Sequence, residues 1–253
     1  MSKNDRELEK EKSSIDRFLD ALWVERGLSD NTLQAYRNDL YGFTKWQHQQ
    51  GNTLHDSKAG ELLVFLGSNS KQSVRTTARR LSSLRRFFQF LVNEGLLKED
   101  PTSTIESPKL GRPLPKTLTE SEVEALLYAP DIKTDIGIRD RTMLEVLYAT
   151  GLRVSELVNL RLDQINLRQG VIRVIGKGNK ERLVPLGEEA MDWLTRYLSE
   201  ARPNFFKRDP DASLFPSNRG SAMTRQTFWY AIKRYSVRAG ISKSLSPHVL
   251  RHA

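Results

Sequence analysis

A cluster of prolines near the middle of the chain divides this sequence into two parts. Residues 98–117 hold four prolines, Pro101, Pro108, Pro113 and Pro115, and the basic residues Lys109, Arg112 and Lys116 lie among the last three of them. Proline fixes φ and lacks a backbone N–H, so this run cannot continue a helix and forms a semi-rigid extended strap. A chain of 253 residues is long enough for a well-buried core. We therefore predict an N-terminal domain over residues 8–98, a linker over 99–116 and a second domain over 117–253.

Helical periodicity dominates the first domain. Apolar residues recur at helical spacing over 15–23 and over 33–46, and a glycine follows each run. A short apolar helix is expected around 61–66. Residues 1–12 are highly charged and are expected to be a frayed lead-in. Together with a helix over 71–92, these elements predict a bundle of four helices.

The helix predicted over residues 71–92 has one apolar face and one basic face. The apolar face carries Leu81, Leu84, Phe88 and Leu91, and the basic residues are Lys71, Arg75, Arg79, Arg80, Arg85 and Arg86. Like charges at helical spacing destabilise an isolated helix by roughly 0.2–0.5 kcal/mol per pair, which a bound anion would offset. The face is either simply solvated or lies along a phosphate backbone.

The sequence of the second domain predicts helices joined by one β-hairpin. A capping box at residues 119–122 starts a helix, and the apolar helix over 140–150 ends at Gly151. Two β-branched runs, 171–175 and 182–186, flank a Gly/Asn turn and predict a hairpin.

Further helices follow the hairpin. One is expected over 188–200, and a basic one follows a cap at Thr224 and carries Arg225 and Lys233. The fold class is mainly α with a small antiparallel β-sheet, in two domains.

Charge and cysteine content narrow the function classes. The net charge of +9 indicates a polyanionic partner, and by itself it suits a ribosomal or RNA-binding protein equally well. The absence of cysteine excludes disulfides, thiolate zinc sites and cysteine nucleophiles. The charged start does not resemble a secretory signal, and no apolar run has membrane-spanning length, so we expect a cytoplasmic protein with no membrane partner.

Four residues from three separate segments of the sequence suit phosphodiester chemistry without a metal. Arg153 and Arg251 are planar, permanently charged donors that can clamp a phosphate as negative charge develops. Lys177, in the hairpin turn, can protonate the leaving 5′ oxygen. His248, three residues before Arg251, titrates near neutral pH and can accept a proton. Glu156, three residues after Arg153, can orient either the histidine or the arginine.

Each signal also has a simpler interpretation. The H-x-x-R spacing of His248 and Arg251 occurs by chance in many helices. His248 and His252 are four residues apart, as zinc ligands can be, but no third ligand is evident and we predict no metal. The residues 176–178 lack P-loop spacing and could be a plain hairpin turn.

Taken together, these motifs resemble those of a known family. The matching segments are residues 149–157 (ATGLRVSEL), 174–182 (VIGKGNKER), 245–253 (LSPHVLRHA), 18–23 (FLDALW) and 31–37 (NTLQAYR). The chain resembles the tyrosine recombinase, or phage-integrase-like, family of the XerC/XerD type, and within it the XerD branch. The resemblance implies an N-terminal SAM-like core-binding bundle of four helices and a C-terminal α+β catalytic domain that is incomplete.

The resemblance also implies an activity and its residues. Arg153 and Arg251 would activate the scissile phosphate, Lys177 would be the general acid, His248 would assist proton transfer, and Glu156 would support them. Cleavage and rejoining would pass through a 3′-phosphotyrosine, with no cofactor. We expect the DNA to be contacted by a set of basic residues: Lys71, Arg75, Arg79, Arg80, Arg85, Arg225 and Lys233. Two alternatives are a non-catalytic two-lobed DNA-binding protein and a type IB topoisomerase-like enzyme.

The resemblance further implies partners and one departure from the family. The partners would be a palindromic double-stranded DNA site, a paralogous XerC-like recombinase in a heterotetramer, and a cell-division DNA translocase, in the resolution of chromosome dimers. The family's nucleophilic tyrosine follows the H-x-x-R motif, and none of the seven tyrosines occupies that place. We therefore expect a C-terminally truncated chain that binds DNA, does not cleave it, and assembles weakly.

Overall fold

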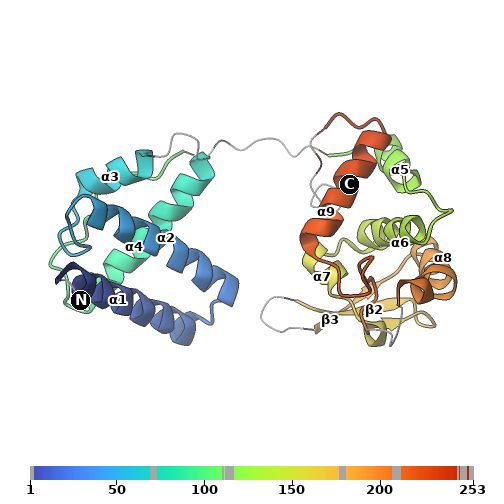
Figure 1. Cartoon of the computed structure of the whole chain (residues 1–253), viewed down its shortest axis with the longest axis horizontal. Helices are drawn as coiled ribbons and strands as arrows, with labels where there is room; N and C mark the ends of the chain where they lie inside the picture. The colour runs from blue at the N-terminus through green and yellow to red at the C-terminus, as the bar shows by residue number, and fades with distance from the viewer. Residues whose placement is uncertain are drawn as a thin grey trace. The chain divides into compact units, whose positions relative to one another are not determined.

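A computed structural model places most of the chain in two compact units, Met1–Arg112 and Pro113–Ala253 (Figure 1). The structure describes residues 3–68, 73–109, 111, 117–176, 181–206, 212–243, 245 and 250, without the side chains of residues 3–6. Each unit has its own hydrophobic core.

The first unit is a bundle of helices, as the periodicity predicted. Its described helices are α1 (Lys3–Arg26), α2 (Asp30–Gln49), α3 (Ala59–Gly67) and α4 (Val74–Asn93). The predicted apolar face of α4 is confirmed, since Leu81, Leu84, Phe88 and Leu91 are all buried. Phe18 of α1 meets Phe87 of α4 edge-on, with ring centroids 5.4 Å apart. Burial of aromatic side chains therefore joins α1 to α4.

The expectation of a frayed lead-in over residues 1–12 is wrong for its described part. Helix α1 already begins at Lys3. Glu11 is buried and accepts hydrogen bonds from the backbone N–H of Leu54 and the Nε2 of His48, each at 2.7 Å. These long-range contacts hold a highly charged segment that local sequence alone would leave unsupported.

The second unit packs helices around a long central one. The elements in order are α5 (Glu120–Tyr128), α6 (Asp135–Thr150), α7 (Val154–Val158), β1 (Ile165–Asn166), β2 (Val171–Ile175), β3 (Glu181–Pro185), α8 (Glu188–Arg196) and α9 (Arg225–Arg238). Helix α6 is buried from Gly137 to Leu147. Figure 1 shows α6 with α5 above it, α9 to its left and α8 to its right.

The small sheet is antiparallel with strand order β1-β2-β3. Ile175 pairs with Glu181, so β3 begins one residue earlier than the predicted strand. Strand β1 was not predicted, because two residues are too few to show an alternating pattern. The predicted hairpin of β2 and β3 is confirmed, although its turn, residues 177–180, lies outside the described part of the chain.

The segment predicted as one helix, residues 188–200, adopts two helical conformations, one after the other. Helix α8 ends at Arg196, and a π-helical turn, Tyr197–Ala201, leads into a 3₁₀ turn, Arg202–Phe205. Tyr197 is buried there and donates a hydrogen bond of 2.9 Å to the carbonyl of Leu214. Anchoring of Tyr197 to a segment distant in sequence explains why helical periodicity alone missed the change.

The capping residues behave as the sequence predicted. Thr119 accepts from the N–H of Glu122, whose carboxylate accepts from the N–H of Thr119, and Thr224 caps α9. Gly151 ends α6 in the left-handed region at φ 57°. Among the described residues, no helix combines the length and apolar character that crossing a bilayer requires.

Candidate active site and basic surfaces

Arg153 stands at the sharp break between α6 and α7. Gly151 turns the chain, Leu152 is buried, and Arg153 occupies the N-cap position of α7 with extended backbone angles. Its side chain is 47% exposed. The buried leucine therefore anchors the turn while the next residue projects its guanidinium toward solvent.

Glu156 holds Arg153 in this position. Its Oε2 accepts a hydrogen bond of 2.8 Å from the Arg153 backbone N–H, and its Oε1 accepts one of 3.0 Å from the Arg153 Nη1. The Oε2 also accepts a hydrogen bond of 2.9 Å from Nη2 of Arg182 on β3. Sequence reasoning did not single out Arg182, which lies 26 residues beyond Glu156.

The environment keeps Glu156 ionised. Burial raises the pKa of its carboxyl, but the hydrogen bonds from the Arg182 side chain and from the Arg153 backbone and side chain, together with the positive charge of Arg182, lower it further than burial raises it. The net effect is a pKa below the ordinary value of 4.5. Glu156 is therefore a fixed anion at neutral pH, suited to orienting a cation rather than to transferring a proton.

The other predicted catalytic residues, Lys177, His248 and Arg251, lie outside the described residues. Their convergence on Arg153 stays a prediction. Leu250, the immediate neighbour of Arg251, is described and is buried in the core of the second unit.

The basic face of α4 is more structural than its sequence indicates. Arg79 forms an ion pair with the buried Asp39 of α2, and the Nε of Arg80 lies 3.7 Å from the same carboxylate. Ser83 donates a hydrogen bond of 2.9 Å to Asp39. The absence of acids within α4 is thus compensated by one acid on a neighbouring helix.

Two further arginines of α4 differ in their partners. Arg85 donates to the carbonyl of Ile105 and, at 2.7 Å, to the Oγ of Ser107. Arg75 is exposed and has no hydrogen bond or ion pair with any other described residue. Lys71 lies outside the described part. Of the predicted DNA-binding residues on this helix that the structure describes, Arg75 is the most available to a ligand.

Helix α9 carries the two remaining predicted DNA-binding residues. Arg225 is its first residue and directly follows the Thr224 cap. The Nζ of Lys233 lies 3.7 Å from the ring centroid of Trp229, a cation–π contact that restrains the ammonium on the helix surface.

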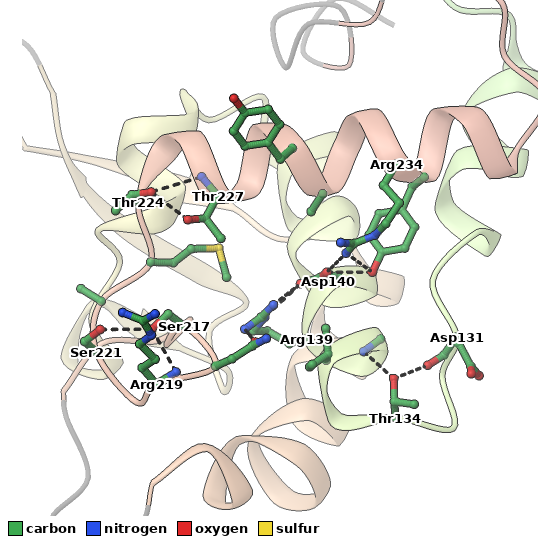
Figure 2. Close-up of a pocket in the computed structure, with 18 of the residues that line it drawn as sticks. Asp131, Thr134, Arg139, Asp140, Ser217, Arg219, Ser221, Thr224, Thr227 and Arg234 are labelled. Carbon is green, nitrogen blue, oxygen red and sulfur yellow. Dashed lines mark hydrogen bonds and ion pairs between the residues drawn. The ribbon is translucent and has the colours of Figure 1, made fainter.

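A pocket of about 840 Å³ lies between the start of α6, the segment 217–223 and α9. Figure 2 shows Asp140 in its wall, bonded to Arg139 and close to Arg234. Asp140 is fully buried, and the Nε and Nη2 of Arg139 donate to its Oδ1 at 2.9 and 2.8 Å. Sequence reasoning missed this network because its members come from distant segments.

Metal-binding clusters are missing from the part of the chain that the structure describes: no three His, Cys, Asp or Glu residues gather there in a way that could hold an ion. The cationic site around Arg153 is instead built from guanidinium groups and one carboxylate.

Comparison with protein families identifies both units. Residues 15–95 match the phage integrase N-terminal SAM-like domain, and residues 116–253 match the phage integrase family. The tyrosine recombinase XerD of Pseudomonas aeruginosa is 57% identical over 241 residues, which cover 94% of this chain and 81% of the relative. The chain belongs to the phage integrase family of tyrosine recombinases. The XerD of Yersinia pestis, 52% identical over 94% of this chain and 81% of its own length, agrees with membership in the XerD type.

Solved structures of a site-specific recombinase and of an integrase share the fold. The XerH site-specific recombinase bound to its difH substrate matches 97% of this chain and 84% of its own with a TM-score of 0.72 at 20% identity. Lambda integrase (residues 75–356) bound to DNA matches 94% of this chain and 82% of its own, with a TM-score of 0.72 at 19% identity. The predicted fold class, a helical SAM-like domain followed by an α+β integrase domain, is confirmed.

Proposed function

We propose that this tyrosine recombinase is a subunit of a site-specific DNA recombinase that cuts and rejoins strands through a 3′-phosphotyrosine link. The observation that carries the proposal is Arg153, which the buried Glu156 holds at an exposed helix break. A permanently charged guanidinium group in this position suits a phosphodiester whose non-bridging oxygens gain negative charge during cleavage.

The chemical roles follow from the residue types. Arg153 and Arg251 clamp the scissile phosphate, Lys177 protonates the leaving 5′ oxygen, and His248 assists proton transfer. Glu156 does not react and orients Arg153. We propose that Lys71, Arg75, Arg79, Arg80, Arg85, Arg225 and Lys233 contact the DNA backbone, with Arg75 making a freer contact than Arg79.

Relatives support the choice of partner. The XerH structures hold difH substrate, and a lambda integrase tetramer is bound to a Holliday junction. We propose that this chain acts on a palindromic duplex site with a paralogous XerC-like recombinase in a heterotetramer. Its cellular role would be chromosome dimer resolution in the cytoplasm at division, with a cell-division DNA translocase as a further partner.

A polypeptide of these 253 residues is proposed to bind the site without cleaving it. The seven tyrosines all precede the H-x-x-R motif. Duplexes that this polypeptide selects from a random pool should contain a palindromic sequence, and the footprint on them should span roughly three helical turns. No covalent adduct between protein and DNA should form. A covalent adduct with this polypeptide would contradict the proposal.

Catalysis is tested with a fusion protein made from this chain and a relative. Residues of the Pseudomonas aeruginosa relative that follow its aligned region are joined to this chain, and covalent trapping on nicked site DNA is measured. We expect the fusion to form an adduct, Arg153→Ala to abolish it while the site is still bound, and Arg161→Ala to behave as the parent. Arg161 is a suitable control because its side chain is exposed and forms an ion pair of 3.5 Å with an aspartate that is exposed as well.

Two outcomes separate the alternatives. If Arg153→Ala lowers affinity and the fusion never forms an adduct, the non-catalytic DNA-binding protein is favoured. Relaxation of supercoiled plasmids without a specific site would favour a type IB topoisomerase-like enzyme.

A further inference from the structure

Two arginines from different elements share the carboxylate of Glu156. Nη2 of Arg182 on β3 donates to Oε2 at 2.9 Å, and Nη1 of Arg153 donates to Oε1 at 3.0 Å. The side chain of Glu156 is only 7% exposed, while those of Arg182 and Arg153 are 39% and 47% exposed. A single buried anion therefore lies between two cations that both reach solvent.

The way in which Arg153 and Arg182 share the two carboxylate oxygens of Glu156 decides how much of the Arg153 guanidinium remains available to a ligand. An arginine facing a carboxylate alone favours two parallel hydrogen bonds, which use two of its three guanidinium nitrogens. Here Oε2 is occupied by Arg182 and by the Arg153 backbone N–H, so only one guanidinium nitrogen of Arg153 contacts Glu156. The other nitrogens, Nε and Nη2, have no hydrogen bond or ion pair within the described part of the chain.

We propose that Arg182 is a positioning residue for Arg153. By occupying Oε2 of Glu156, Arg182 prevents the carboxylate from engaging both terminal nitrogens of Arg153, and so keeps that guanidinium open to a phosphate. Arg182 itself need not touch the substrate. The inference rests on the proposed function, because it assumes that Arg153 binds a phosphate of the recombination site.

Loss of Arg182 has a defined consequence. A buried carboxylate that loses one of two cations binds the remaining cation more fully. Arg153 therefore turns onto Glu156 and leaves the phosphate. The contact between Arg153 and the phosphate weakens, while contacts elsewhere on the DNA are unchanged.

The test measures one phosphate at a time with the 253-residue polypeptide, so that no cleavage is needed. Neutral methylphosphonates replace single phosphates across the selected site, and affinity is measured for the parent and for Arg153→Ala. The phosphate bound by Arg153 is the one whose neutralisation weakens the parent about tenfold and leaves Arg153→Ala unchanged. If no phosphate behaves in this way, the proposed function and this inference both fail.

Arg182→Gln is then measured on the same pair of duplexes. We expect its tenfold sensitivity at that phosphate to disappear, and its sensitivity at the other phosphates to persist. Arg182→Lys, which keeps a charged donor to Glu156, should retain part of the sensitivity. The double variant Arg182→Gln/Glu156→Gln removes the unbalanced anion and should regain part of it. Arg173→Gln, an exposed arginine of the neighbouring strand β2, is the matched control and should behave as the parent.

Two results would overturn the inference while leaving the proposed function intact. One is full sensitivity of Arg182→Gln at the Arg153 phosphate. The other is a uniform loss of affinity at every phosphate with no recovery in Arg182→Lys or in the double variant, which would mark a purely structural role for Arg182.

Discussion

Tyr235 on α9 donates a hydrogen bond of 2.7 Å to Oδ2 of Asp140, a fully buried carboxylate on α6 that lies 95 residues earlier in the chain. Arg139 bonds the other oxygen of Asp140, and Nη2 of Arg234 lies 3.7 Å from Oδ2. A buried charge is tolerated only when its lone pairs are satisfied in this way. The network therefore holds α9, which carries Arg225 and Lys233, against the central helix.

Replacing Tyr235 by phenylalanine removes one hydrogen bond to a buried charge. We expect the free energy of unfolding at pH 7 to fall by about 1.5–3 kcal/mol, measured by denaturant titration. Tyr230→Phe is the control, because Tyr230 on the same helix is 55% exposed and should change little. Equal losses in the two variants would contradict the role of the Asp140 contact.

The same tyrosine predicts an alkaline dependence. Burial, followed by the nearby charge of Asp140, raises the pKa of Tyr235 from 10.0 to about 12. Because the folded pKa is raised, the contribution of Tyr235 to stability is fully present below pH 10 and is lost as pH rises from 10 to 12. The difference in unfolding free energy between the parent and Tyr235→Phe should shrink over this window, and a constant difference would contradict it.

Gly137, in the first turn of α6, permits a close backbone approach. A Cβ there would lie 1.8 Å from the carbonyl oxygen of Asp131. We expect Gly137→Ala to displace the start of α6 and to destabilise the protein by about 1–3 kcal/mol. Gly42→Ala, in α2, should have the opposite sign: a Cβ there meets nothing within 4 Å, and alanine favours a helix by about 0.5–1 kcal/mol. Thermal unfolding followed by circular dichroism measures both, and similar shifts would argue against the steric account.

Arg75 and Arg79, one helical turn apart on α4, should separate DNA affinity from stability. Arg75→Gln removes a phosphate contact, so the slope of log affinity against log salt should fall by about 0.9 with the stability unchanged. Arg79→Gln leaves the buried Asp39 with less compensation and should lower the free energy of unfolding by about 1–3 kcal/mol. Fluorescence anisotropy over a salt series and denaturant titration measure the two effects. A loss of stability in Arg75→Gln would contradict this prediction, because it would mean that Arg75 makes stabilising contacts within the protein.

Glu156 predicts an acid dependence. The pKa of Glu156 is below 4.5 in the folded state, so its stabilising contribution is present above about pH 4.5 and is lost as pH falls through the folded pKa. Glu156→Gln should therefore be less stable than the parent by about 1.5–3 kcal/mol at pH 7, and by less at pH 3. The exposed Glu124→Gln serves as the control. A difference that is independent of pH would indicate that Glu156 acts through shape rather than charge.

Features that depend on neighbouring residues were predictable from the sequence. The Thr119 capping box, the end of α6 at Gly151 and the buried face of α4 each arise within a few residues, because caps and helical periodicity are local. The spacing of Arg153 and Glu156, three residues apart, likewise predicted that the glutamate could orient the arginine, and the two side chains form an ion pair.

Features that depend on long-range contacts were not predictable. The pairing of Arg79 with Asp39 spans 40 residues, and that of Arg182 with Glu156 spans 26. No periodicity in the sequence indicates such pairs. From the sequence alone, the arginines of α4 therefore form a basic face without ion-pair partners. The irregular turn at Tyr197 was hidden for the same reason, since a contact with Leu214 holds it.

The sequence by itself determined the helices, the hairpin, the division into two domains and the family, because caps, proline and apolar spacing act locally and motifs retain their order. Only the tertiary structure decided which charges are free. Whether a charged side chain is free in a folded protein depends on the partners that the fold brings to it. Asp39 and Glu156 each bind an arginine from another element, Arg79 and Arg182, and no local pattern in the sequence indicates these pairs.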